Sequence, residues 1–254
     1  MSAALIAWSF LPGLLWLWYV HRHDRFQPEP LRRIVMVFVG GMVATIPAGL
    51  FNVLGGQIFP QPGHGVVMST LDAFVVVGPV EETVKYLAAF FLAYKSVDFD
   101  EPIDGLVYSG AAALGFASAE NLEYVARFGS DVVQMRAFTA VPGHFIFAGA
   151  VGYSVGLARA GHATTATAGL VTAALMHGLY DAFLFANLEL DMPVLALGAI
   201  AVLIVGAARY RKYVTHLTSL SPFRPGAGNL VCRPCHRLLP PDSRFCDRCG
   251  ATAA

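Results

Sequence analysis

The chain has 254 residues, of which 56% are hydrophobic and only 13% are charged, and its acidic and basic side chains are equal in number. A soluble domain carries about 25% charged residues, so this composition excludes an ordinary soluble domain and indicates a polytopic membrane protein. The net charge of zero gives no sign of a nucleic-acid partner. All four cysteines lie at or after Cys232, which excludes a disulfide-stapled ectodomain.

Seven apolar runs are long enough to cross a bilayer as helices, since a span needs about 20 residues. The predicted fold class is therefore an all-α polytopic membrane protein with about seven transmembrane helices and a small soluble tail. The predicted spans, in chain order, are Ala3–Val20, Ile34–Leu54, Val66–Tyr94, Ile103–Ala126, Val132–Leu157, Thr164–Asn187 and Met192–Ala208. Gly78-Pro79 falls inside the third span and predicts a division into two half-helices, because proline removes a backbone hydrogen bond.

Positive charges in the loops predict how the spans are oriented. The first loop, 21–33, holds four arginines, and the second, 55–65, holds no Lys or Arg. The third loop holds Lys95, the fifth holds Arg159, and Arg209 is the first of several basic residues after the last span. Because cytoplasmic loops carry an excess of Lys and Arg, we expect a cell-membrane protein with its N-terminus outside and its C-terminus in the cytoplasm. Arg127, in the fourth loop, runs against this trend.

Two adjacent carboxylates, Glu81 and Glu82, lie inside the apolar third span. A charge at mid-membrane costs roughly 2.5–3.5 kcal/mol on insertion scales, so such groups usually mark function. Lys85 follows Glu81 by four residues and Glu82 by three, so on a helix it can reach both. One ammonium neutralises one carboxylate, and the second is left as a candidate general base or acid. The alternative is a structural Glu–Lys pair that fixes the helix register.

Polar side chains on three further spans are predicted to converge with this pair, because all of them fall between the bilayer centre and the outer face in the predicted orientation. They are Glu120 and Asn121 on the fourth span, His144 on the fifth, and His177 with Asp181 on one face of the sixth. Such a set can activate a water and stabilise an oxyanion, or bind a divalent metal. Taken singly, each has a structural alternative, such as a histidine oriented by a carboxylate.

These residues resemble the motifs of the PrsW family. The motifs are Glu81-Glu82-x-x-Lys85, Phe116-x-x-x-Glu120-Asn121, an isolated His144 and His177-x-x-x-Asp181, with Asp24 and Pro28-Glu29-Pro30 as a weaker match in the first loop. The resemblance covers roughly residues 20–190 and implies an intramembrane endopeptidase that cuts membrane-anchored proteins, such as anti-sigma factors, on the outer side. The wider group, which includes CAAX prenyl endopeptidases and bacteriocin-processing proteins, has His where Glu120 stands and Asn where Asp181 stands.

The resemblance also implies roles for the catalytic residues. Glu82, or Glu81, would act as the general base on a water molecule. His144 and His177 would polarise the substrate carbonyl or protonate the leaving amine, and Asp181 would orient His177.

Lys85 would hold the carboxylate pair, while Glu120 and Asn121 would shape a water or metal site. Whether a divalent metal sits there stays open at this point. Two other functions also stay open: a proton- or metal-coupled transporter, because intramembrane Glu and His chains serve as relays, and a non-catalytic membrane scaffold that signals through the tail.

The tail carries two C-x-x-C pairs, Cys232 with Cys235 and Cys246 with Cys249. This spacing predicts a structural zinc site with four thiolate ligands, which resembles a zinc ribbon. Such a module binds protein or nucleic acid, or caps the tail. About twenty residues cannot fold on their own core, so the metal would supply stability. Two disulfides are the alternative. The predicted parts are a transmembrane protease-like domain (1–212), a flexible linker (213–229) and the zinc-ribbon tail (230–254).

Overall fold

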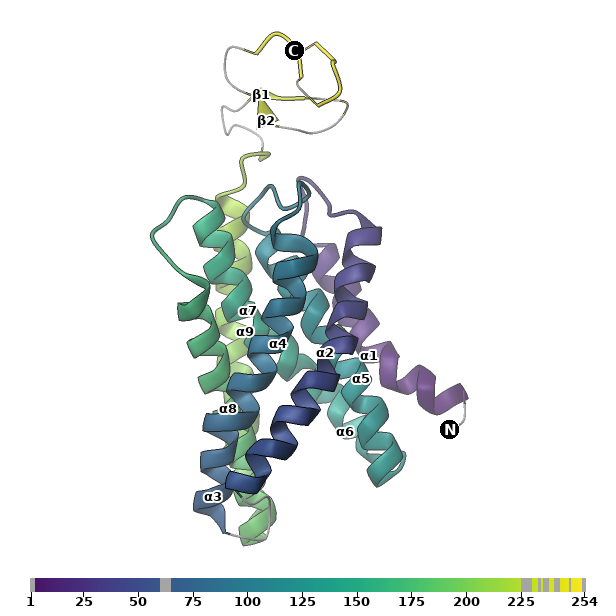
Figure 1. Cartoon of the computed structure of the whole chain (residues 1–254), viewed down its shortest axis with the longest axis vertical. Helices are drawn as coiled ribbons and strands as arrows, with labels where there is room; N and C mark the ends of the chain where they lie inside the picture. The colour runs from purple at the N-terminus through teal and green to yellow at the C-terminus, as the bar shows by residue number, and fades with distance from the viewer. Residues whose placement is uncertain are drawn as a thin grey trace.

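The computed structural model describes residues 3–59, 65–224, 230–232, 234, 238–239, 243–246 and 248–252. Within them the protein is a bundle of helices with a small two-stranded unit at one end (Figure 1). The elements are α1 (Ala3–His21), α2 (Leu31–Ile58), α3 (Val66–Asp72), the π-helical turn η1 (Ala73–Val77), α4 (Gly78–Ala89), the π-helical turn η2 (Phe90–Tyr94), α5 (Asp104–Phe128), α6 (Asp131–Phe138), α7 (Ala140–Arg159), α8 (Ala166–Leu190), the 3-10 turn η3 (Pro193–Leu195), α9 (Ala196–Ser219), β1 (Leu230–Val231) and β2 (Leu238–Leu239).

The helical, multi-pass character predicted from composition is confirmed. Four helical segments of the described chain are long and apolar enough to cross a membrane, namely Leu31–Ile58, Asp131–Arg159, Ala166–Leu190 and Pro193–Ser219. The count of seven spans stays a prediction. The fifth predicted span is divided at Thr139 into α6 and α7, and α9 continues to Ser219, into the region predicted as a linker.

The outer surface of the bundle is apolar, as a lipid-facing surface requires. On α2 the exposed large side chains recur every three or four residues, which places them along one face of the helix. These residues are Val35, Val39, Val43, Ile46, Leu50 and Val53. Charged side chains such as Glu82 and Lys85 are buried inside the bundle. The protein is therefore apolar on its outer surface and partly polar in its interior.

Helix α5 is the centre of the bundle and packs against α1, α2, α4, α6 and α7. Every residue from Asp104 to Ser118 is buried. Small residues make this packing close: a Cβ atom on Gly41 of α2 would lie 2.0 Å from the carbonyl oxygen of Ala112, and one on Gly115 would lie 1.9 Å from that of Phe38. The backbones of α2 and α5 therefore touch, as small residues allow in membrane helices.

The third predicted span is one continuous helical run from Val66 to Tyr94, so the prediction of two half-helices is wrong. The run widens into the π-helical turn η1 directly before Gly78-Pro79. Pro79 cannot donate a backbone hydrogen bond, and a local π turn accommodates that missing bond without ending the helix. As a result Glu81 and Glu82 lie in the first turns of α4, both buried.

Candidate active site

Helix α4 presents three buried charged side chains to the bundle interior. The Lys85 ammonium lies 2.9 Å from Oε1 of Glu82 and 3.5 Å from Oε2 of Glu81. The predicted reach of one lysine to both carboxylates is therefore observed. Glu81 also accepts a hydrogen bond of 3.3 Å from the side-chain amide of Asn52 on α2. Glu82 is thus held firmly, while the contacts of Glu81 are longer.

His144, from the first turns of α7, connects α4 to α5. Its Nδ1 lies 2.7 Å from the Lys85 ammonium and its Nε2 lies 2.8 Å from Oε2 of Glu120. An ammonium can only donate, so Nδ1 accepts, and the neutral ring then donates from Nε2 to the carboxylate. Phe116 of α5 places its ring 4.4 Å from the same ammonium and closes this side of the site.

His177, on α8, joins the two glutamates from the opposite side. Its Nδ1 lies 2.9 Å from Oε1 of Glu82, and its Nε2 lies 3.4 Å from Oδ2 of Asp181 and 3.8 Å from Oε2 of Glu81. The four-residue spacing of His177 and Asp181 brings them to one helix face, as predicted. The two imidazole rings are 5.2 Å apart between centroids.

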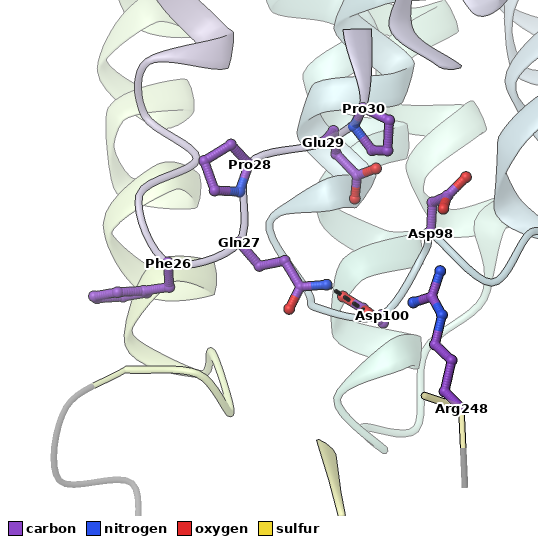
Figure 2. A pocket seen from close by; sticks show the side chains of 8 residues that line it. All are labelled: Phe26, Gln27, Pro28, Glu29, Pro30, Asp98, Asp100 and Arg248. Atoms are coloured by element: carbon purple, nitrogen blue, oxygen red, sulfur yellow. Dashed lines mark hydrogen bonds between the residues drawn. The ribbon is translucent and has the colours of Figure 1, made fainter. Parts of the chain in front are cut away.

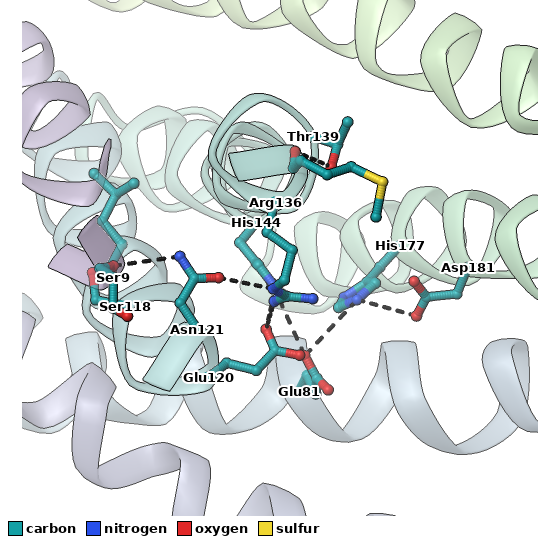
Figure 3. Close-up of polar contacts among 12 residues, drawn as sticks. Ser9, Glu81, Ser118, Glu120, Asn121, Arg136, Thr139, His144, His177 and Asp181 are labelled. Carbon is teal, nitrogen blue, oxygen red and sulfur yellow. Dashed lines mark hydrogen bonds and ion pairs between the residues drawn. The ribbon is translucent and has the colours of Figure 1, made fainter. Parts of the chain in front are cut away.

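Arg136, on α6, belongs to the same network, as Figure 3 shows, and the sequence reasoning missed it. Its guanidinium lies 2.7 Å from Oε2 of Glu120 and donates at 2.8 Å to the side-chain oxygen of Asn121. The side-chain amide of Asn121 in turn donates to the backbone carbonyl of Ser9 on α1. The sequence did contain an indication of this role, because Arg136 is a charged residue inside a segment predicted to span the membrane, where charges are rare.

The eight predicted site residues are therefore all brought together in the bundle interior by α4, α5, α7 and α8. Glu81, His144 and His177 each offer one possible metal-ligand atom within 4.8 Å of the others. Two histidines and one carboxylate are the protein ligands of several catalytic zinc sites, which leave a position open for water. The arrangement can therefore hold either a water molecule or a divalent metal.

The balance of charged side chains in the site bears on the choice between a water molecule and a divalent metal. Four carboxylates, those of Glu81, Glu82, Glu120 and Asp181, face two permanent cations in this network. An excess of two negative charges in a buried site is costly unless a cation or protons offset it. The donor set and the charge excess both fit a divalent metal.

Three of the four tail cysteines lie close together. The Sγ atoms of Cys232, Cys246 and Cys249 are within 4.8 Å of one another, whereas Cys235 lies outside the described residues. The backbone amide of Arg248 lies 3.4 Å from Sγ of Cys246, and Gly250 follows with a φ of 73°. Backbone amides that donate to a cysteine sulfur in a tight turn are typical of metal-bound thiolates, whose negative charge they help to stabilise.

Comparison with known proteins identifies relatives of this chain. The profile of a family described as "PrsW family intramembrane metalloprotease" matches residues 29–208. Protease PrsW of Geobacillus kaustophilus is 30% identical over 188 residues, which cover 72% of this chain and 81% of that protein. Protease PrsW of Bacillus subtilis is 29% identical over 72% of this chain and 84% of its own length. The Clostridioides difficile protein of the same name is 28% identical over 85% of this chain and 94% of its own. No solved structure matches the chain.

Proposed function

This chain belongs to the PrsW family, and we propose that it is an intramembrane endopeptidase that cleaves membrane-anchored proteins at the site formed by Glu81, His144 and His177. Its named relatives are proteases, and the chain is accordingly a peptidase of the membrane. The observation that carries the proposal is the meeting of one carboxylate and two imidazoles from three different helices, α4, α7 and α8, inside an apolar bundle.

Glu81 is the better candidate for the general base of the two adjacent glutamates. Its Oε2 lies 4.0 Å from Nδ1 of His144 and 3.8 Å from Nε2 of His177, so a water near these atoms would contact all three groups. Oε1 of Glu82, by contrast, is occupied at 2.9 Å by both Lys85 and His177. Glu82 is therefore proposed to position these two side chains.

Peptide hydrolysis needs a bond from the water oxygen to the carbonyl carbon and loss of the C–N bond. Glu81 would take the proton of the attacking water and return it to the departing amine. His177 is held through Nδ1 by Glu82, so its Nε2, which lies 3.4 Å from Asp181, would donate the hydrogen bond to the developing oxyanion. Asp181 would be the partner of that Nε2 before substrate binds. Arg136 would keep Glu120 in place behind His144.

Glu81, His144 and His177 would also be the residues that hold a divalent metal, if the family's metalloprotease description applies to this chain. A metal bound there would polarise the carbonyl and lower the pKa of a bound water to about 7. Binding through Nδ1 of His144 would require Lys85 to release that nitrogen and keep its contacts with the two glutamates.

We further propose the finer features predicted from the sequence. These are seven spans, an outside N-terminus, a cytoplasmic C-terminus and cleavage on the outer side, with single-pass proteins of the anti-sigma-factor type as substrates. The tail would form a structural zinc site with Cys232, Cys235, Cys246 and Cys249, supported by the closeness of three of their sulfurs. A transporter is not favoured, because the relatives are named as proteases.

The test is cleavage of a panel of single-pass membrane proteins from the same cell by the purified full chain in lipid vesicles. Glu81→Gln should abolish cleavage, whereas Glu123→Gln, which alters an exposed carboxylate paired with Arg127, should leave it unchanged. Elemental analysis of the same preparations counts bound zinc: loss of one equivalent in His144→Ala supports the membrane metal. A folded wild-type protein that cleaves no member of the panel would overturn the proposal.

A further inference from the structure

A second group of carboxylates, outside the candidate active site, is buried where two loops meet. Asp24 and Glu29 belong to the loop between α1 and α2, Glu101 precedes α5, and Asp104 is the first residue of α5. All four side chains are nearly inaccessible, with exposed fractions of 0 to 3%. This acidic cluster lies at the end of the bundle from which the chain continues into the tail (Figure 1).

In three of these carboxylates, those of Asp24, Glu101 and Asp104, one oxygen accepts hydrogen bonds from the protein. Oδ2 of Asp24 accepts a hydrogen bond of 2.8 Å from the backbone amide of Glu29. Oδ2 of Asp104 accepts from the backbone amides of Asp100 and Glu101 at 2.9 and 2.8 Å. Oε2 of Glu101 accepts from the hydroxyl of Ser221. These bonds fix the orientation of the three carboxylates.

The second oxygen of each of these three carboxylates accepts no hydrogen bond from the described residues. Oδ1 of Asp24, Oε1 of Glu101 and Oδ1 of Asp104 are buried and have no hydrogen-bond partner within the described part of the chain. The three residues each offer an oxygen within 4.8 Å of the others. Buried carboxylate oxygens without partners are costly, and three that face one another repel. The arrangement therefore has the electrostatics of a cation site.

No lysine or arginine among the described residues forms an ion pair with Asp24, Glu101 or Asp104. Two basic side chains of this end of the bundle have other partners: Arg33 pairs with Asp98 at 2.8 Å, and Arg159 donates to the backbone carbonyl of Phe99. A small inorganic cation is thus the species whose charge and size suit the cluster.

We propose that Asp24, Glu101 and Asp104 bind a hard divalent cation, Ca²⁺ or Mg²⁺, at this end of the bundle. All-oxygen ligand sets are those preferred by these ions, and Ca²⁺ binds oxygens at about 2.3–2.6 Å, so ligands on opposite sides of it lie about 4.8 Å apart. The bound cation would join the first loop to the start of α5 and, through Ser221, to the chain that follows α9.

A cavity lies beside the acidic cluster. It has a volume of about 370 Å³ and is lined by residues of both loops and by Arg248 of the tail, as Figure 2 shows. Glu29 belongs to both the cavity wall and the acidic cluster. The tail therefore contributes a residue, Arg248, to the wall of the cavity beside the proposed ion site.

The competing account is that the carboxyl groups share protons. Burial and the neighbouring carboxyl of Glu101 raise the pKa of Asp24 to about 9, so a cluster without a cation would hold protons at neutral pH. A proton-sharing cluster binds no ion, which separates the two accounts experimentally.

The experiment is calorimetric titration of the purified full chain in nanodiscs, freed of Ca²⁺ and Mg²⁺, first with CaCl₂ and then with MgCl₂. We expect one equivalent of one of these ions to bind and the unfolding temperature to rise with its concentration. Glu101→Gln and Asp104→Asn should each weaken binding by about tenfold or more, since the number of charged ligands sets the affinity. Both changes keep side-chain shape and remove a buried charge, so folding is expected to survive.

Two controls assign the ion to the cluster. Glu123→Gln removes an exposed carboxylate from α5, and Glu81→Gln removes an oxygen from the candidate active site; both should bind the ion as the wild type does. Wild-type protein that binds neither ion at millimolar concentrations would overturn the proposal in favour of shared protons. Binding that persists in both Glu101→Gln and Asp104→Asn would overturn it by placing the ion elsewhere.

Discussion

Replacing Glu81 by glutamine should remove activity at a small cost in stability, whereas replacing Glu82 by glutamine should mainly destabilise the fold. Glu82 is 1% exposed and lies 2.9 Å from both the Lys85 ammonium and Nδ1 of His177. A glutamine there leaves a buried ammonium without its closest counter-charge. Removal of one partner from a buried ion pair typically costs about 3–5 kcal/mol.

Glu81 is held more loosely, by contacts of 3.5 Å to Lys85 and 3.3 Å to Asn52. A glutamine keeps the shape of the side chain and can still bond Asn52, so we expect a loss of about 1–2 kcal/mol in stability. Its effect on the reaction should be larger, because a general base contributes about 10²- to 10⁴-fold to the rate.

The assay pairs cleavage of a substrate from the single-pass panel with unfolding followed by tryptophan fluorescence in nanodiscs. The three tryptophans of the chain serve as the reporter. The expected pattern is an inactive, stable Glu81→Gln and a Glu82→Gln with a clearly lower unfolding temperature. A Glu82→Gln protein as stable as the wild type but inactive, beside an active Glu81→Gln, would refute the reasoning and make Glu82 the base.

Three further predictions concern the packing, the network and the tail. Gly41→Ala should destabilise the bundle by about 1–3 kcal/mol, because its Cβ would lie 2.0 Å from a carbonyl oxygen of α5. The control Gly49→Ala, with no atom within 4 Å of the new Cβ, should be neutral or stabilising in the same unfolding measurement. Arg136→Gln should lower the cleavage rate and the unfolding temperature together, since it leaves the partly buried carboxylate of Glu120 without its cation. An unchanged cleavage rate would exclude a role of Arg136 in the reaction. Cys232→Ser should release one zinc by elemental analysis without affecting cleavage, and an unchanged zinc count would rule out the tail site.

The membrane nature of the protein follows from its sequence because composition and run length report directly on the solvent around each helix. The lipid-facing surface of α2 and the helical character of the bundle agree with that prediction. The contacts of Lys85 with the glutamates and of His177 with Asp181 were also foreseeable, since both depend only on the three- and four-residue spacings of one helix.

Spacing within one helix says nothing about the register between helices, and that register was decided by tertiary packing. It is set by where backbones touch, as α2 and α5 do at Gly41 and Gly115. Only that packing brought Arg136 to Glu120, gave His144 both a lysine and a glutamate as partners, and distinguished the firmly held Glu82 from the looser Glu81. The adjacent glutamates are equivalent in the sequence, and they differ in the structure because neighbouring side chains of one helix point about 100° apart, toward different helices of the bundle.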